Sequence, residues 1–83
     1  MNETERRIER VFRDALGVEV SSPTLDVIEE GILDSLGLVT LLVELEREFS
    51  VAIPLDLDID SLRTVERLAA LVERVGAEEG SMP

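Results

Sequence analysis

Apolar residues recur at helical spacing near the start of the chain, between residues that favour the two ends of a helix. Asn2, followed three residues later by Glu5, has the form of a helix N-terminus, and Gly17 suits a helix C-terminus. Positions three or four apart between them carry Ile8, Val11, Phe12, Ala15 and Leu16. The pattern predicts an amphipathic helix from about Asn2 to Gly17.

A second amphipathic helix is expected towards the other end of the chain. Thr64 can cap it. Its apolar face holds Val65, Leu68, Ala69, Val72 and Val75. Gly76 is expected to end this helix. Residues 77–83 are polar and small, so we expect them to form a frayed tail.

The middle helix is expected to run from Ser35 to about Phe49 or Ser50, and apolar residues cover two arcs of its surface. At about 100° per residue, the wider arc holds Leu38, Leu41, Leu42, Leu45 and Phe49. The narrower arc, on the other side of Ser35, holds Leu36, Val39 and Val43. Because polar residues fill the remaining sector, we expect the wider arc to face the core and the narrower arc to dock a partner. The alternative is that Leu36 and Val43 also belong to the core.

The segment 18–33 is apolar without sustained helical spacing and contains Ser21-Ser22-Pro23. Unstructured loops of this length are uncommon in compact domains and tend to be functional or well packed. We therefore predict a long ordered loop that lies over the helices. Val18, Glu19 and Val20 alternate as in a strand, but no second strand is visible to pair with them.

A short acidic segment follows the turn at Pro54. Three aspartates alternate there with apolar residues: Asp56, Asp58 and Asp60. This spacing is like the first half of an EF-hand calcium loop, but the position that needs glycine is Ser61 and the position of the bidentate glutamate is Arg67. The favoured interpretation is a short helix or turn that holds Leu57, Ile59 or Leu62 against the core.

Together these elements predict one all-α domain over residues 1–83, with a core of about 3–76. Three longer helices and one short helix would form a small four-helix bundle, with the long loop between the first two helices. Eighty-three residues support one modest core and leave no room for a deep substrate cavity. With two phenylalanines and neither Trp nor Tyr, that core is expected to be aliphatic.

The formal net charge of −11 argues against nucleic acid and anionic membranes as partners, since both would be repelled. It favours basic protein partners, although an acidic surface can also serve solubility alone. Residues 1–7 do not resemble a signal peptide, and no apolar run approaches the length of a membrane span. We therefore expect a cytoplasmic monomer without stable membrane insertion.

The side chains of the common catalytic and metal sites are missing. The chain has no histidine and no cysteine, which excludes Ser-His-Asp and Cys-His arrangements, zinc sites built from these ligands, and disulfides. The nineteen carboxylates have no evident cleft in which to act as an acid–base pair. We therefore expect neither an enzyme nor a metal protein.

The candidate chemistry lies where the long loop meets the middle helix, in the run Gly31-Ile32-Leu33-Asp34-Ser35-Leu36-Gly37. On the simplest interpretation, Asp34 and Ser35 only cap the helix, because their oxygens accept from unpaired N–H groups of its first turn. The narrower apolar arc beside Ser35 instead indicates a docking surface around an exposed hydroxyl.

Four features in this order resemble the acyl carrier protein superfamily: Asp34-Ser35-Leu36, the segment 44–49, Ile53-Pro54 and Thr64-Val65. The resemblance covers the chain from about Ile8 to Val75 and implies a bundle of acyl-carrier type. It also implies that a phosphopantetheinyl transferase uses coenzyme A to esterify Ser35 with 4′-phosphopantetheine, which carries an acyl or aminoacyl group as a thioester. A helix N-terminus suits the phosphodiester anion. Because the chain has no cysteine, the thiol has to arrive on the arm.

The same resemblance implies roles for the residues around Ser35. Asp34 would cap the helix and contact the transferase or its metal. Leu36, beside the attachment site, would dock partners together with Val39 and Val43. Three acidic residues would orient those partners, unless they form an ordinary solvated face: Glu44, Glu46 and Glu48.

The type of carrier is indicated by departures from the fatty-acid pattern. Gly37 and Thr40 stand where carriers of fatty-acid synthesis generally have acidic residues, and Arg47 interrupts the acidic run. The stretch 30–37 is more similar to D-alanyl carrier proteins and other free-standing carriers, which a dedicated adenylating ligase loads with an amino or hydroxy acid. Peptidyl carrier domains usually have Gly-Gly where this chain has Ile32-Leu33.

We therefore predict a discrete carrier of an activated small acid, which receives its cargo from an adenylating acyl or aminoacyl ligase and delivers it to a downstream acyltransferase or synthase. Two alternatives stay open. One is an acyl carrier of a specialised fatty-acid or polyketide pathway. The other is a non-catalytic interaction module in which Ser35 is never modified.

Overall fold

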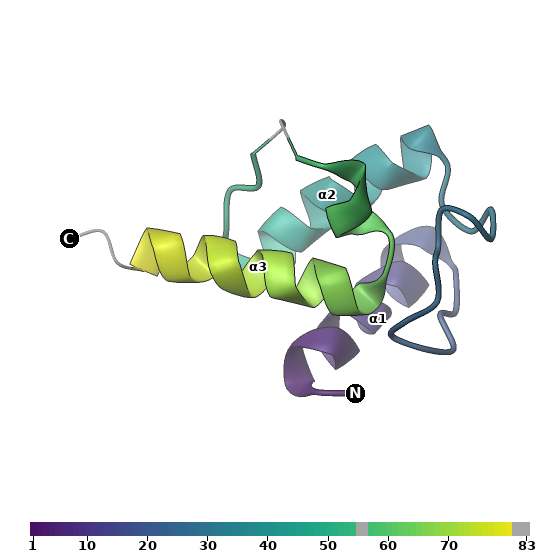
Figure 1. The fold of residues 1–83 in the computed structure, drawn as a ribbon, viewed down its shortest axis with the longest axis horizontal. Coiled ribbons are helices and arrows are strands. Elements are labelled where there is room, and N and C mark those ends of the chain that lie inside the picture. Colours follow the sequence, from purple (N-terminus) through teal and green to yellow (C-terminus); the bar gives the residue numbers. More distant parts are fainter. Residues whose placement is uncertain (55–56, 81–83) are drawn as a thin grey trace.

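The computed structural model describes residues 1–54 and 57–80, and within them it contains helices and no strand. The elements are α1 (Glu3–Leu16), α2 (Ser35–Phe49), the short 3-10 helix η1 (Ile59–Leu62) and α3 (Val65–Gly80). Figure 1 shows the long loop between α1 and α2 passing around one end of the molecule. The predicted all-α fold, with three longer helices and one short one, is confirmed.

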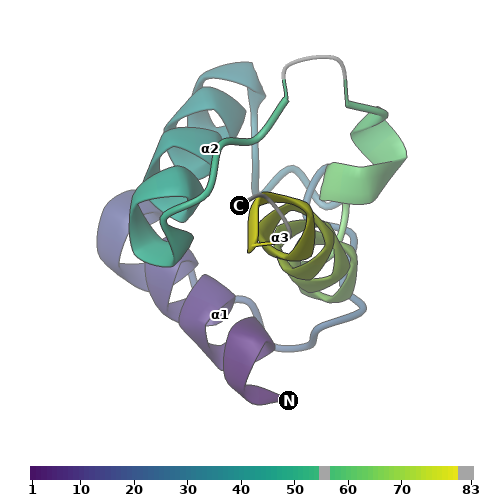
Figure 2. The same ribbon diagram turned by 90° about the vertical axis from the view of Figure 1, so that its left-hand side faces the viewer.

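The three long helices surround a single core. Helix α1 contacts both α2 and α3, α2 also contacts α3, and η1 packs on α3. Figure 2 shows this arrangement with α3 seen almost end-on, facing α1 and α2. The largest fully buried side chains are aliphatic except for one phenylalanine: Phe12, Ile8, Leu41, Leu45, Leu68, Val27 and Val65. The expectation of an aliphatic core is confirmed.

Helix α1 begins and ends as its sequence predicts. The Asn2 side chain accepts a 2.8 Å hydrogen bond from the Glu5 N–H, and the Glu5 carboxylate accepts one of 2.9 Å from the Asn2 N–H. This reciprocal pair satisfies two donors that the first helical turn would otherwise leave unpaired. Gly17 ends the helix in the left-handed conformation, at φ 67°, which glycine adopts without steric cost.

Helix α3 begins as predicted but ends later. The Thr64 hydroxyl accepts a 3.0 Å hydrogen bond from the Arg67 N–H, which confirms the cap. Gly76 does not end the helix, which continues to Gly80. The left-handed glycines in the described chain are Gly17 and Gly31, so Gly76 keeps a helical backbone.

Gly76 lies within α3, close to another segment of the chain. A β-carbon there would lie 3.7 Å from Val51 Cγ1, so Gly76 faces the segment that follows α2. The next residues, Ala77, Glu78 and Glu79, are good helix formers and extend the helix. Part of the predicted tail is therefore helical, and its last three residues, 81–83, lie outside the described chain.

The long loop is part of the core, as predicted. Val20, Val27 and Leu33 are each at most 5% exposed. Two backbone hydrogen bonds tie the loop to the start of α3: the Val27 N–H donates to the Arg63 carbonyl at 2.8 Å, and the Glu66 N–H donates to the Pro23 carbonyl at 2.9 Å. The loop therefore has a fixed path to the start of α2.

The acidic segment before α3 forms the predicted short helix. The Asp58 side chain caps η1 by accepting the Asp60 N–H at 3.1 Å, while Leu62 is buried and Ile59 is about half exposed. Asp56 lies outside the described residues. Within the described chain, no group of three or more acidic side chains is close enough together to hold a metal ion. None of the described helices is both long and apolar enough to cross a bilayer.

Candidate functional site

Ser35 is the first residue of α2, and the residues before it are fixed in place. Leu33 is buried, and its N–H donates to the Val27 carbonyl at 2.9 Å. Asp34 then adopts an extended backbone, and its side chain accepts a 2.7 Å hydrogen bond from the Gly37 N–H. The chain thus passes from a core anchor, through a helix cap, to an exposed serine.

The Ser35 hydroxyl is available for chemistry. Ser35 is exposed, and its hydroxyl makes no hydrogen bond to the part of the chain that the structure describes. It sits at the positive end of the α2 dipole, beside backbone N–H groups of the first turn that lack helical partners. This environment favours an anion, such as a phosphodiester, over a neutral group.

The two apolar arcs of α2 separate as predicted. On the wider arc, Leu41 and Leu45 are fully buried. The narrower arc reaches the surface, where the exposed fractions are 76% for Leu36, 59% for Val39 and 47% for Val43. We call these three residues the apolar stripe. The alternative that Leu36 and Val43 are core residues is wrong.

The carboxylates of the three glutamates predicted to orient partner proteins each contact a group of this chain. Glu44 is 3.5 Å from the Arg47 guanidinium. Glu46 accepts a 2.8 Å hydrogen bond from the Ile53 N–H and so fixes the turn after α2. These two contacts are local, and they leave both glutamates half-buried.

Glu48 belongs to a contact between α1 and α2. Its carboxylate lies 2.9 Å from Arg7 Nε, and its carbonyl accepts a second hydrogen bond of 2.8 Å from the same side chain. The Arg7 guanidinium also lies over the Phe49 ring, 4.3 Å from its centre. The described contacts of Glu48 are therefore structural.

A small apolar hollow of about 150 Å³ opens beside Ser35. It is lined by Ile28, Leu33, Asp34, Ser35, Leu38 and Ile59. Leu38 and Ile59 also line a neighbouring hollow of about 210 Å³ that extends towards Pro54 and Leu62. A larger hollow of about 520 Å³ lies between α1 and α2, but none of its lining residues adjoins Ser35. The hollow of about 150 Å³ belongs to the candidate site, because Ser35 is one of its lining residues.

Sequence reasoning missed two residues of this site, Ile28 and Ile59. Both are apolar residues in segments without helical periodicity, so no pattern distinguished them from other loop residues. They meet beside Ser35 because the long loop and η1 approach the same end of α2.

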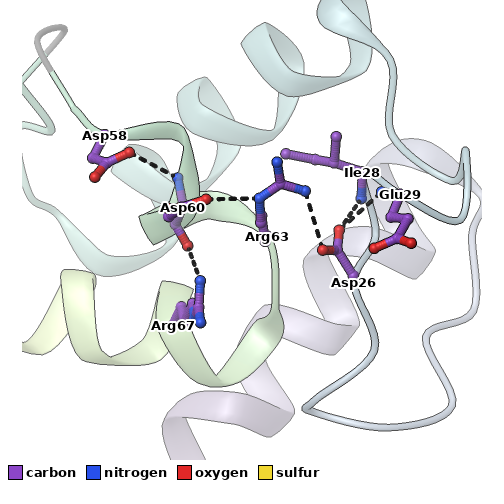
Figure 3. Close-up of polar contacts among 7 residues, drawn as sticks. All are labelled: Asp26, Ile28, Glu29, Asp58, Asp60, Arg63 and Arg67. Atoms are coloured by element: carbon purple, nitrogen blue, oxygen red, sulfur yellow. Dashed lines mark hydrogen bonds and ion pairs between the residues drawn. The ribbon is translucent and has the colours of Figure 1, made fainter.

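Asp26 and Arg63 form the main electrostatic feature near this hollow. The hydrogen bond from the Glu29 backbone N–H makes the largest contribution and lowers the pKa of the Asp26 carboxyl. Burial opposes it, and the hydrogen bond from Arg63 lowers the pKa by a smaller amount than burial raises it. Asp60 and Asp26, in that order, raise the pKa of Arg63 by accepting its hydrogen bonds. Figure 3 shows the guanidinium between the two carboxylates.

The family model for the phosphopantetheine attachment site matches residues 6–72, which is most of the chain. The chain belongs to this family. The resemblance to acyl carrier proteins is thereby confirmed: residues 6–72 form a carrier domain of this family, which is not catalytic, and 4′-phosphopantetheine is its prosthetic group. The exposed hydroxyl at the N-terminus of α2 fits the attachment of that group.

Similar proteins include several D-alanyl carrier proteins. The chain is 40% identical to that of Bacillus licheniformis over 48 residues, which cover 57% of this chain and 62% of the relative. It is 40% identical to that of Lactococcus lactis subsp. cremoris over 50 residues, covering 59% and 63%. D-alanyl carrier protein 1 of Lactiplantibacillus plantarum is 36% identical over 55 residues, covering 65% and 69%. The chain thus matches less than two thirds of the length of the first two relatives.

Proposed function

We propose that Ser35 Oγ carries the 4′-phosphopantetheine group and that the protein holds an activated small amino or hydroxy acid on it. The observation that supports this most is the exposed Ser35 hydroxyl at the capped N-terminus of α2, beside the apolar stripe. When bound, the group supplies the thiol that holds the cargo as a thioester.

Attachment would require a separate enzyme. Ser35 Oγ would form a bond to the phosphorus next to the pantetheine of coenzyme A, the pyrophosphate P–O bond would break, and adenosine 3′,5′-bisphosphate would leave. The proton of the hydroxyl has to pass to a base. The Asp34 carboxylate accepts the Gly37 N–H in this structure, so we assign Asp34 to capping and assign deprotonation to the phosphopantetheinyl transferase.

The apolar stripe would dock that transferase, an adenylating ligase and a downstream acyltransferase or synthase in turn. Three exposed aliphatic side chains next to the reactive serine make a compact contact surface on a rigid helix. Glu44, Glu46 and Glu48 would contact the same partners. Their role would be secondary, because each carboxylate already contacts a group of this chain.

The cargo class is proposed from the relatives and from α2. The relatives are D-alanyl carrier proteins, which supports an amino acid or a similarly small acid. Gly37 and Thr40 leave the start of α2 without the acidic residues of a fatty-acid carrier. The alternative, an acyl carrier of a specialised fatty-acid or polyketide pathway, is favoured by the apolar hollow beside Ser35. If the protein is instead an interaction module in which Ser35 is not modified, it would bind its partner through the apolar stripe alone.

Loading assays distinguish these candidates. The phosphopantetheinylated protein would be incubated with ATP and either a D-alanine-activating ligase with its amino acid or an acyl ligase with a short fatty acid. Intact-protein mass spectrometry would report the product. Aminoacylation without acylation supports the proposal, acylation alone supports the acyl-carrier alternative, and a protein that never accepts the arm supports the interaction module.

A further inference from the structure

Arg63 connects two segments that are far apart in the sequence. Its Nε lies 2.8 Å from Asp60 Oδ1 in η1, and its terminal nitrogen lies 3.1 Å from Asp26 Oδ2 in the long loop. Its carbonyl accepts the Val27 N–H at 2.8 Å. Figure 3 shows these side-chain bonds meeting at one guanidinium. One residue thus holds η1 to the loop through both its side chain and its backbone.

Each connected segment supplies one wall of the hollow beside Ser35. Ile28 follows Asp26 by two residues, and its N–H donates to Asp26 Oδ1 at 3.0 Å. Ile59 directly precedes Asp60 in η1. Both isoleucines line the hollow. Arg63 therefore connects the two segments that carry these walls.

We propose that Arg63 is a clamp that keeps the hollow beside Ser35 narrow, and that its release lets Ile28 and Ile59 move apart. The side chains of Arg63 and Asp26 are 32% and 27% exposed, and that of Asp60 is 63% exposed. Ion pairs at such solvated positions are individually weak, so the clamp can open without unfolding the domain.

Whether the clamp is closed or released would determine whether the cargo is shielded from solvent. This consequence rests on the proposed attachment at Ser35, whereas the clamp itself does not. With the clamp closed, the aliphatic chain of a cargo stays outside the hollow and exposed to solvent. With the clamp released, the hollow widens towards its neighbour across Ile59 and admits the chain.

The first test uses the unmodified protein and two variants that break the bridge from opposite sides. Arg63→Gln removes a positive charge and Asp26→Asn removes a negative one, so a shared effect is not one of net charge. Arg74→Gln is the control, because Arg74 is an exposed arginine of α3 with no ion pair in the described chain. Hydrogen exchange would be followed at the Val27 and Leu33 amides, which donate to the Arg63 and Val27 carbonyls.

The clamp predicts at least tenfold faster exchange at both amides in the two bridge variants and no change in the control. The buried Leu45 amide reports global opening and should keep its rate. Unchanged Val27 and Leu33 rates in the bridge variants, or equal acceleration in Arg74→Gln, would overturn the proposal. Equally accelerated exchange at the Leu45 amide would also overturn the proposal, because it would show that the variants destabilise the whole domain.

The second test addresses shielding in protein that carries the arm. Wild type and Arg63→Gln would be loaded with hexanoyl or acetyl groups and cleaved with hydroxylamine. We expect slower release of hexanoyl, but not of acetyl, from the variant. Equal hexanoyl release from both proteins would overturn the effect on cargo. Failure to load either protein would contradict the attachment proposal, while the exchange experiment would still report on the clamp.

Discussion

The Asp34 carboxylate and Gly37 are closely packed at the start of α2. The carboxylate accepts the Gly37 N–H at 2.7 Å, and a β-carbon on Gly37 would lie 3.1 Å from the same oxygen and 3.2 Å from Leu33 Cδ1. A larger residue at position 37 would need the capping carboxylate or the Leu33 side chain to shift by a few tenths of an ångström. Glycine fits position 37 without any such shift.

Removing this cap should cost stability. Asp34→Ala leaves the Gly37 N–H without its acceptor, and we expect a loss of about 1 kcal/mol in the free energy of unfolding, measured with urea. Asp34→Asn keeps a side-chain oxygen and should retain most of that stability. If Asp34 also contacts the transferase through its charge, both variants should be modified slowly. Equal stability of Asp34→Ala and wild type would show that the cap contributes nothing.

Two leucines of α2 allow the wider, buried arc to be compared with the narrower, exposed arc. Leu45 is fully buried and Leu36 is 76% exposed. Leu45→Ala should lower the free energy of unfolding by about 2–5 kcal/mol, and Leu36→Ala should change it by less than about 0.5 kcal/mol. Urea unfolding of the two variants measures both. Similar losses would mean that the arcs are not divided between core and surface.

The apolar stripe should serve docking rather than folding. Val39→Asp places a charge at its centre, so we expect nearly unchanged thermal stability and at least tenfold slower modification or loading. Ala70→Asp, an exposed position on α3, is the control with the same added charge. A large drop in the melting temperature of Val39→Asp would place Val39 in the core, and normal loading would remove the stripe from the docking surface.

The Asp26 carboxyl, which accepts the Glu29 N–H and pairs with Arg63, gives the stability of the fold a defined pH dependence. The folded state lowers the pKa of Asp26, so its contribution is present above the ordinary carboxyl range and is lost as the pH falls through the lowered pKa. Asp26→Asn lacks this titration. The melting temperatures of wild type and Asp26→Asn should therefore differ at pH 7 and converge below about pH 4. If the difference in melting temperature between wild type and Asp26→Asn stayed constant down to pH 2, this would contradict the stabilisation of the fold by ionised Asp26.

Local sequence signals predicted the parts of the fold that depend on neighbouring residues. The Asn2–Glu5 pair, Gly17 and Thr64 each act within one helical turn, and the arcs of α2 follow from helical periodicity alone. Ser35 was proposed as the attachment point from its place between a cap and an apolar helix, together with the resemblance to acyl carrier proteins.

Contacts between distant segments were not predictable in this way. Gly76 faces Val51 instead of ending α3, and Glu48 binds Arg7, which is 41 residues away. The Arg63 bridge depends on the path of a loop that has no periodic pattern. Gly76 and Glu48 are ordinary residue types for the roles predicted for them, and only their contacts with other elements show different roles. Arg63 had no predicted role.

The attachment of 4′-phosphopantetheine to Ser35 is tested most directly by mass spectrometry of the intact protein. Wild type, Ser35→Ala and Ser21→Ala would be incubated with coenzyme A and a broad-specificity phosphopantetheinyl transferase, with a D-alanyl carrier protein as positive control. Ser21 is an exposed serine of the long loop. We predict that wild type and Ser21→Ala each gain the mass of one arm and that Ser35→Ala gains none. Modification of Ser35→Ala, or an unmodified wild type beside a modified positive control, would contradict this account.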